Sequence, residues 1–209
     1  MPWKTTPTPV TLELPGGRAR LVPYSHEHVP QLVEAMGDGS LFRWMPVPPP
    51  VTPELMSAFM GKALGAQARG EEIAFTIMDR STGRAVGSTR YLDIRHADMG
   101  LEIGWTWLGD AAQRTSINTE CKLLLLRHAF EELGALRVQL KTDARNARSR
   151  AAIGRIGARF EGILRRQRVL PDGHVRDSAY YSIIAQEWEF VRDRLDFMLN
   201  ERRTPAPVQ

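Results

Sequence analysis

The chain has 209 residues, of which 43% are hydrophobic and 25% charged, a composition typical of a globular protein with one full core. Its single cysteine, Cys121, excludes an internal disulfide and a multi-cysteine metal site, so we expect it to pack in the interior. The net charge of +4 is mildly basic, but the basic residues are scattered among acidic ones, which argues against a nucleic-acid-binding surface.

No stretch reaches the roughly 20 apolar residues that span a bilayer. The first 17 residues lack the apolar core and the small-residue cleavage site of a signal peptide. We therefore expect a cytoplasmic protein with no membrane association. We divide the chain into an extended arm rich in Pro and Thr (1–17), one mixed α/β domain (18–188) and a C-terminal helix and tail (189–209).

The first half of the domain predicts a strand, two helices and three strands. These are expected over 18–23 (strand), 25–36 and 53–69 (helices), and 73–78, 84–93 and 101–108 (strands). A proline-rich extended segment, 41–53, separates the two helices. Trp44 and Met45 in this segment are candidates for lining a substrate pocket, although a packed connector explains them equally well.

The second half alternates helices and strands. Its elements are expected over 118–133, 147–156 and 186–199 (helices) and over 136–142, 159–169 and 175–185 (strands). Gly134 and Gly157 provide helix stops, and the last two strands are joined by a hairpin turn at 171–174. The tail, 204–209, is expected to be frayed.

The turn 113–118, QRTSIN, joins the strand 101–108 to the helix 118–133. Unpaired N–H groups and the positive end of a helix dipole converge at such a turn, so it predicts a phosphate site. An ordinary capped connection explains the same pattern. The sequence has neither the glycine-rich lysine loop of P-loop NTPases nor the dinucleotide-binding glycine pattern at this turn.

Three motifs in this order resemble the GCN5-related N-acetyltransferase (GNAT) family. QRTSIN is similar to the family's Q/R-x-x-G-x-G/A pyrophosphate loop, and the segment 146–158, NARSRAAIGRIGA, is similar to its N-x-x-[SA] helix signature. The strand 101–105, LEIGW, resembles that of the RimJ/RimL-like subgroup, which modifies ribosomal-protein N-termini. The resemblance implies one domain with a central mixed, mostly antiparallel sheet of about seven strands flanked by helices. It also implies acetyl transfer from acetyl-coenzyme A to a primary amine in a ternary complex.

The resemblance assigns the coenzyme site to two segments and one strand. The residues implied are Trp105, Thr106, Gln113, Arg114, Thr115, Ser116, Ile117, Asn118, Thr119, Asn146 and Ser149. Ser116 and Asn118 stand where the family usually has glycine-type residues; Asn tolerates the left-handed conformation and Ser can cap a helix, so we expect the loop to bind pyrophosphate still. Lys122, Arg148 and Arg150 are candidates for the 3′-phosphate, or simply form a solvated helix face.

The catalytic roles are left with alternatives. Glu102 is the expected base and also contacts the acceptor; the competing interpretation is a structural carboxylate paired with Arg90 or Arg95. Many relatives carry a tyrosine acid where this chain has Ile153, so Ser149, Tyr180 and Tyr181 are the candidates for protonating the thiolate. We expect no metal ion, because the five histidines show no ligand spacing.

Two other functions compete with catalysis. A non-catalytic acyl-coenzyme A sensor would keep the fold without turnover, and an RNA- or ribosome-associated module would show salt-dependent nucleic-acid binding. The acceptor itself, a small amine, an amino acid or a protein N-terminus, is not separated by the sequence. A homodimer is expected through pairing of the apolar strand residues 180–184.

Overall fold

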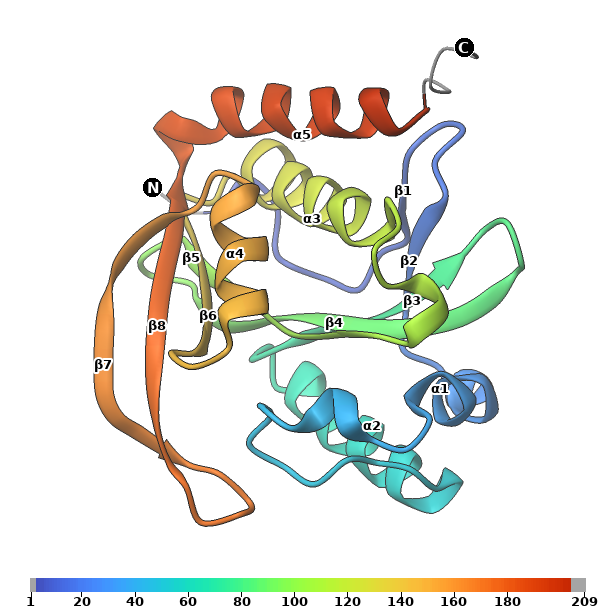
Figure 1. The fold of residues 1–209 in the computed structure, drawn as a ribbon. Helices are drawn as coiled ribbons and strands as arrows, with labels where there is room; N and C mark the ends of the chain where they lie inside the picture. The colour runs from blue at the N-terminus through green and yellow to red at the C-terminus, as the bar shows by residue number, and fades with distance from the viewer. Residues whose placement is uncertain (1–2, 204–209) are drawn as a thin grey trace, which may run out of the picture.

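The computed structural model describes residues 3–203, and its centre is one eight-stranded sheet (Figure 1). The strand order is β1-β2-β3-β4-β5-β6-β8-β7, and neighbouring strands are antiparallel except for β5 and β6. The strands are β1 (Leu12–Glu13), β2 (Ala19–Pro23), β3 (Ile73–Asp79), β4 (Arg84–Arg95), β5 (Gly100–Leu108), β6 (Arg137–Asp143), β7 (Arg159–Val169) and β8 (Val175–Ile184). The expected mixed, mostly antiparallel sheet is confirmed, with β1 in the predicted arm as the additional strand.

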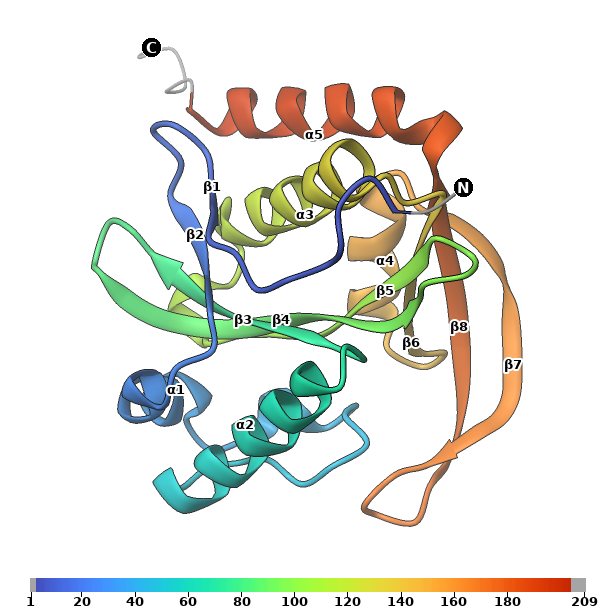
Figure 2. The same ribbon diagram turned by 180° about the vertical axis from the view of Figure 1, so that it is seen from behind.

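Helices cover both faces of the sheet (Figures 1 and 2). α3, α4 and α5 lie on one face and α1 and α2 on the other. Their bounds are α1 (Val29–Met36), α2 (Pro53–Ala68), α3 (Ile117–Arg127), α4 (Ala147–Arg155) and α5 (Trp188–Arg203). Short helical turns lie at η1 (His26–His28), η2 (Ser40–Phe42), η3 (Asp110–Ala112), η4 (His128–Leu133) and η5 (Ala185–Glu187).

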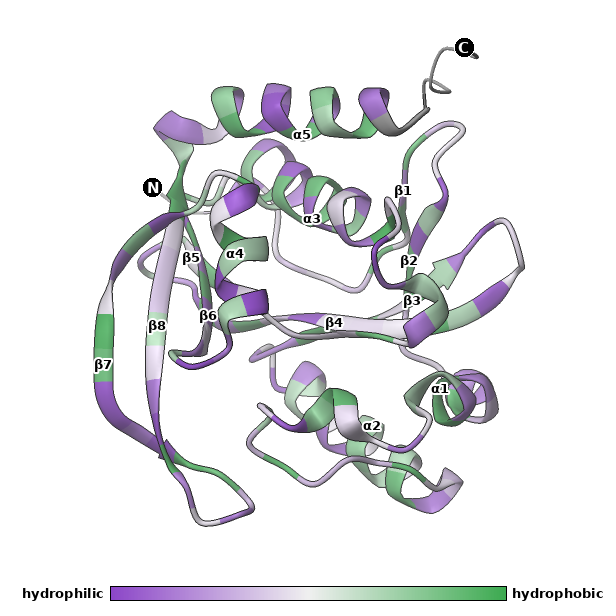
Figure 3. Cartoon of the chain, viewed as in Figure 1, coloured by the Kyte–Doolittle hydropathy of each residue, from purple (hydrophilic) through white to green (hydrophobic). Residues whose placement is uncertain are grey.

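Each helical layer has its own hydrophobic cluster. The larger cluster includes Leu101, Ile103 and the fully buried leucines of α3, and the smaller one joins α1 and α2 to the other side of the sheet. Hydrophobic and hydrophilic residues are mixed along α5, as expected for a helix with one face on the core (Figure 3). Burial raises the pKa of the Cys121 thiol on α3 to about 12, which fits its predicted packing role.

The element boundaries differ from the predicted ones at a few helix ends. Ser25 caps the short turn η1 rather than α1, whose first turn carries a proline. The long helix on the sheet changes from α-helical to π-helical geometry at His128 and ends, as predicted, at Gly134 in the left-handed conformation. The predicted tail 204–209 lies outside the described residues.

β8 is an interior strand. It pairs with β6 on one side and with β7 on the other. Residues 180–182 already pair with both β6 and β7, and residues 183 and 184 pair with β6, so the segment 180–184 as a whole is not a free edge for the expected dimer pairing. The homodimer itself stays a prediction. Within residues 3–203 no helix is both long and apolar enough to cross a membrane.

Candidate active site

The site begins where β5 and β6 separate. The two strands pair in parallel through Gly100↔Arg137, Leu101↔Val138 and Glu102↔Gln139, and no further along β5. The rest of β5, from Ile103 to Leu108, continues along β4 while β6 turns toward β8. Backbone groups on this side of β5 therefore face an opening between two strands instead of a neighbouring strand.

A bulge lies in β5 at the same level. Gly104 pairs with Arg90 and Trp107 with Ser88, so Trp105 and Thr106 both lie opposite the single residue between them on β4. Trp105 has a φ of 51°, which is uncommon for a bulky residue. Bulges disturb the ladder locally and re-aim the strand, so the backbone at these two residues is released from regular sheet bonding.

The turn 113–118 leads from this strand into α3. The left-handed residue is Arg114, with a φ of 62°, whereas Ser116 is right-handed at −71° and Asn118 lies inside the first turn of α3. The expectation that Asn118 replaces glycine by adopting a left-handed conformation is therefore wrong. Neither departure from the family pattern needs positive φ. Ser116 occupies the N-cap of α3, and its side chain makes no capping hydrogen bond.

Several side chains of the turn brace it from within. The Gln113 amide donates to the Leu108 carbonyl at 2.8 Å and accepts from Arg148 on α4 at 2.7 Å. The Thr115 hydroxyl donates to the Ala112 carbonyl at 2.7 Å, and the buried Thr119 hydroxyl accepts from Arg155 at 3.1 Å. The turn therefore offers a ligand mainly its backbone N–H groups at the start of α3.

α4 begins beside this turn, linked to it by the Gln113–Arg148 contact. Asn146 is its N-cap: the side-chain carbonyl accepts from the Ser149 backbone N–H at 3.0 Å. This bond orients the Asn146 amide and uses one of the two lone pairs of its oxygen, so the NH₂ group remains as a donor to a ligand. Ser149 is half-buried one turn further along α4.

Glu102 is 2% exposed and sits at the last paired position of β5 and β6. Lys141 Nζ lies 2.9 Å from its Oε2, and the Gln139 amide donates to the same atom at 2.9 Å. The alternative pairing with Arg90 or Arg95 is wrong: Arg90 pairs with Glu72 at 3.0 Å, and Arg95 pairs with Asp93. Because Leu101 and Ile103 belong to the cluster under α3, Glu102 points to the opposite face of the sheet, toward α1 and α2.

The proline-rich segment reaches the same face. Trp44 lies under the Arg145 guanidinium, whose central carbon is 5.0 Å from the ring centroid, and its carbonyl accepts from Arg176 on β8 at 3.4 Å. Met45 packs against the cluster of α1 and α2. Trp44 thus lies on the β6–β8 side of the opening, whereas Met45 is part of the hydrophobic packing around α1 and α2.

The two candidate tyrosines lie on opposite faces of β8. Tyr181 is 5% exposed, its ring centroid lies 5.3 Å from that of Phe160, and its hydroxyl accepts from Arg150 on α4 at 3.1 Å. Tyr180 stands beside Lys141, whose Nζ is 5.8 Å from its ring centroid. Tyr181 is therefore on the side of α4, with Ser149, and Tyr180 is on the side of Glu102.

Lys122 does not form part of a solvated helix face. It is 7% exposed, and its Nζ donates to Thr106 at 2.9 Å; the Thr106 and Thr89 hydroxyls are 2.8 Å apart. Burial lowers the pKa of this amine to about 8. The suggestion that it meets the 3′-phosphate is wrong, since the amine is buried under β4 and β5.

The burial of the Lys122 amine predicts how the free energy of unfolding depends on pH. The pKa of Lys122 is about 8 in the folded chain and 10.5 in the unfolded one, so the folded protein releases the proton first and gains stability as pH rises between these values. Replacing Lys122 by methionine removes this gain, which is about 3 kcal/mol. Urea unfolding of both proteins at pH 7 and pH 10.5 measures it. The variant is expected to have the higher free energy of unfolding at pH 7, and the difference between the two proteins is expected to shrink by pH 10.5.

Lys62→Met, at an exposed position of α2, is the matched control for removing any lysine. A difference between wild type and Lys122→Met that stays constant over the pH range would contradict the prediction.

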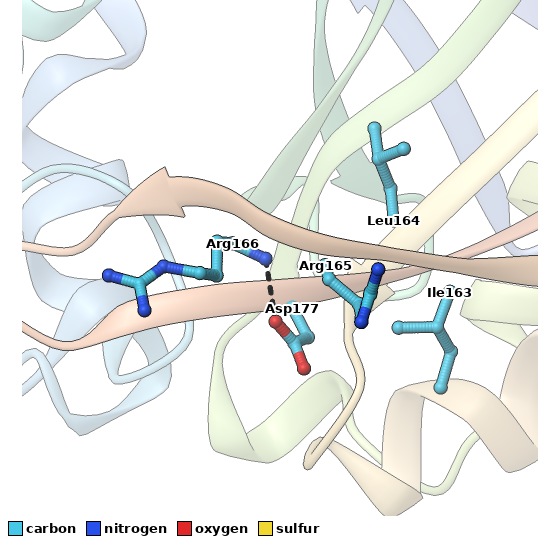
Figure 4. A pocket seen from close by; sticks show the side chains of 5 residues that line it. All are labelled: Ile163, Leu164, Arg165, Arg166 and Asp177. Atoms are coloured by element: carbon cyan, nitrogen blue, oxygen red, sulfur yellow. Dashed lines mark hydrogen bonds between the residues drawn. The ribbon is translucent and has the colours of Figure 1, made fainter.

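The structure also has a hollow away from this site, on the outer hairpin of β7 and β8 (Figure 4). It is lined by Ile163, Leu164, Arg165, Arg166 and Asp177, and the backbone N–H of Arg166 donates to Asp177 at 2.7 Å. Among the residues that the structure describes, no three potential metal-ligating side chains lie together.

Comparison with known proteins decides the family. The acetyltransferase (GNAT) domain family matches residues 18–159, which include β5, the turn 113–118 and α4. The chain belongs to the GNAT acetyltransferase family. The predicted resemblance is confirmed at this level, as is the expectation of an acyl-coenzyme A-dependent acetyltransferase.

Three relatives illustrate the similarity. The "Putative ribosomal N-acetyltransferase YdaF" of Bacillus subtilis (strain 168) is 36% identical over 88 residues, 42% of this chain and 47% of that protein, so the match spans about half of the relative. A GCN5-related N-acetyltransferase from Brucella melitensis is 28% identical with a TM-score of 0.86, covering 99% of this chain and 89% of the other. Mycobacterium smegmatis RimJ, solved with CoA-disulfide, shares the fold at 22% identity and a TM-score of 0.78, covering 95% and 97%.

Sequence analysis missed several residues of the site. Gln139 and Lys141, which hold Glu102, lie on β6, and Arg176 lies on β8, far from Glu102 in the chain. The alternation in RVQLKTD does place Gln139 and Lys141 on one face of a strand, which was a usable signal. Nothing in the sequence indicated Arg176.

Proposed function

We propose that this GNAT protein transfers the acetyl group of acetyl-coenzyme A directly to a primary amine bound in a ternary complex. The observation that carries the proposal is the opening between β5 and β6, which has the N-terminus of α3 near one end and the buried Glu102 at the other. A phosphate-binding helix start and a carboxylate beside unpaired strand backbone together suit an acyl transfer to an amine.

The donor set fits coenzyme A. Backbone N–H groups at the start of α3, at Ser116 and Asn118, favour a pyrophosphate, whereas the Ile117 N–H already donates to the Thr115 hydroxyl at 3.3 Å. The Arg114 conformation shapes the turn before them. The Asn146 amide is held as a donor for the pantetheine arm. When bound, acetyl-coenzyme A supplies the activated acetyl thioester.

The chain's own residues then have three tasks. Glu102 takes the proton from the amine, directly or through water, while Lys141 and Gln139 fix its carboxylate. The backbone N–H groups at the Trp105–Thr106 bulge donate to the negative charge that develops on the acyl oxygen. Ser149 and Tyr181, on the side of α4, are the candidates for protonating the departing sulfur.

A protein or peptide N-terminus is the acceptor class that the family relationship favours, because the curated relative carries the name of a ribosomal N-acetyltransferase. Trp44 would line the acceptor side, on the face opposite α3. The competing function is an acyl-coenzyme A sensor. One observation favours it: Glu102 is already neutralised by Lys141, as in a purely structural ion pair.

The test is a pair of measurements on the purified protein. Calorimetric titration with acetyl-coenzyme A is expected to show binding that weakens roughly tenfold in Asn146→Ala, because a donor to the pantetheine is lost. Release of free thiol in the presence of a panel of amines and N-terminal peptides is expected to follow acetyl transfer. Binding with no turnover on any acceptor would favour the sensor, and no binding at millimolar coenzyme would exclude both functions.

A further inference from the structure

Arg176, the second residue of β8, is a buried cation with too few partners. Its side chain is in the interior, 6% exposed as a residue, and its Nε is buried without a hydrogen-bond partner. Within residues 3–203 its one hydrogen bond is a long one, from Nη1 to the Trp44 carbonyl at 3.4 Å. Burying a guanidinium is costly unless an anion or several acceptors surround it, so the arrangement is incomplete as it stands.

The carboxylates that face Arg176 are already engaged elsewhere. Asp143 accepts from the Arg145 guanidinium at 3.0 and 2.9 Å, and Glu102 is held by Lys141 at 2.9 Å. Both contribute to the field at Arg176, yet in the described part of the chain neither forms an ion pair with it. Arg168, directly opposite on β7, adds a further positive charge.

Burial lowers the pKa of Arg176 from its usual value, but a guanidinium stays charged at neutral pH. The positive charge is therefore fixed and its N–H groups keep a planar, fork-shaped geometry that matches a carboxylate. Lysine, with a rotating point charge, would not impose this geometry.

The position of Arg176 relates it to the acceptor and not to coenzyme A. It contacts Trp44, which lies on the β6–β8 side of the opening, and it faces Glu102 on the side of the sheet opposite α3. The proposed base and the unsatisfied guanidinium thus belong to one region, on the same side of the sheet.

We propose that Arg176 binds a carboxylate carried by the acceptor itself, so that the substrates are amines with a carboxylate close to the reacting nitrogen. This inference rests on the proposed acetyl transfer and names its substrate class. The Arg176 fork holds the carboxylate while the amine of the same molecule is presented to Glu102. Two kinds of acceptor carry this chemistry: a free α-amino acid, and a peptide whose second residue is Asp or Glu.

The test compares acceptors that differ only in the carboxylate. One pair is an amino acid and its amide; the other is an N-terminal peptide amide with Asp and the same peptide with Asn at position two. The wild-type protein is expected to prefer the carboxylate member of at least one pair by roughly ten- to a hundredfold in kcat/KM. The pair that shows the preference identifies the source of the carboxylate.

The variant series assigns the preference to Arg176. Arg176→Gln is expected to bring the two members of the pair within about threefold, while the acetyl-coenzyme A dissociation constant stays near wild type. Arg176→Lys keeps the charge without the fork and is expected to retain part of the preference. Arg168→Gln removes an exposed charge from the facing strand position and is expected to retain all of it.

Three results would overturn the inference. One is a wild-type protein that acetylates both members of each pair equally, since the proposed function would then stand without the carboxylate. Another is an equal loss of preference in Arg168→Gln and Arg176→Gln, because the preference would then come from the positive charge of the region and not from the Arg176 guanidinium. A third is a wild-type protein that does not bind acetyl-coenzyme A, which would remove the proposed function along with the inference.

Discussion

Glu102→Gln is expected to lower kcat about 10²- to 10⁴-fold while the dissociation constant for acetyl-coenzyme A changes little. Glutamine keeps the shape of the side chain and can still accept from Gln139, but it cannot take a proton from the amine. The cofactor contacts proposed at α3 and Asn146 do not involve this residue, whose side chain points to the other face of the sheet. Steady-state kinetics and calorimetry together measure the two quantities.

Lys141→Gln is the control that separates a base from a structural ion pair. Lys141 is the cationic partner of Glu102, at 2.9 Å, so its removal breaks the same pair from the other side. If the pair serves only stability, both variants lower the free energy of unfolding and kcat alike. For a base, Lys141→Gln keeps most of kcat because the carboxylate remains. A Glu102→Gln protein within threefold of wild-type kcat would contradict the assignment.

Ser116→Asp is expected to act on coenzyme binding and on stability in opposite directions. Ser116 is the N-cap of α3, and its side chain makes no capping bond. An aspartate there favours the helix dipole by about 0.3–1 kcal/mol, so the free energy of unfolding is expected to rise slightly. The same charge would repel the pyrophosphate by about 2–4 kcal/mol, a roughly thirty- to thousandfold loss of coenzyme A affinity.

Ser116→Asn is the matched control for Ser116→Asp. Asparagine has nearly the same size as aspartate and is an equally good N-cap, but it carries no charge. It is expected to keep coenzyme A affinity within a few-fold of wild type. Calorimetry with coenzyme A and urea unfolding of both variants make the comparison. Equal affinities for the Asp and Asn variants would contradict the placement of the pyrophosphate at this turn.

The sequence predicts the secondary structure well because its local signals are strong. β7, Arg159–Val169, agrees with its predicted range, and α2 begins at Pro53 and the long helix ends at Gly134 as expected. Those signals, a proline in a first helical turn and a glycine at a stop, are properties of a few neighbouring residues. The π-helical geometry from His128 has no such local signal, and it was not predicted.

The residues of the candidate site also fall into those with a local sequence signal and those without one. The turn 113–118 and the Asn146 cap are contiguous motifs, and the sequence places both beside helix starts. The partners of Glu102 were assigned incorrectly because a carboxylate in a strand contacts residues on the neighbouring strand, whose register the sequence does not give. Both alternatives for Lys122, a 3′-phosphate contact and a solvated helix face, were wrong for a similar reason: its burial depends on which side of α3 meets the sheet.

The sequence by itself determined the family, the order of the elements and the position of the turn 113–118, because each is encoded in a short run of adjacent positions. Only the tertiary structure decided how β5 and β6 diverge, which groups hold Glu102, and that Arg176 lies buried beside Trp44. These features join residues that are far apart in the chain, Arg176 and Trp44 by 132 positions. Their contacts arise from strand pairing and packing, for which a single sequence carries no local signal.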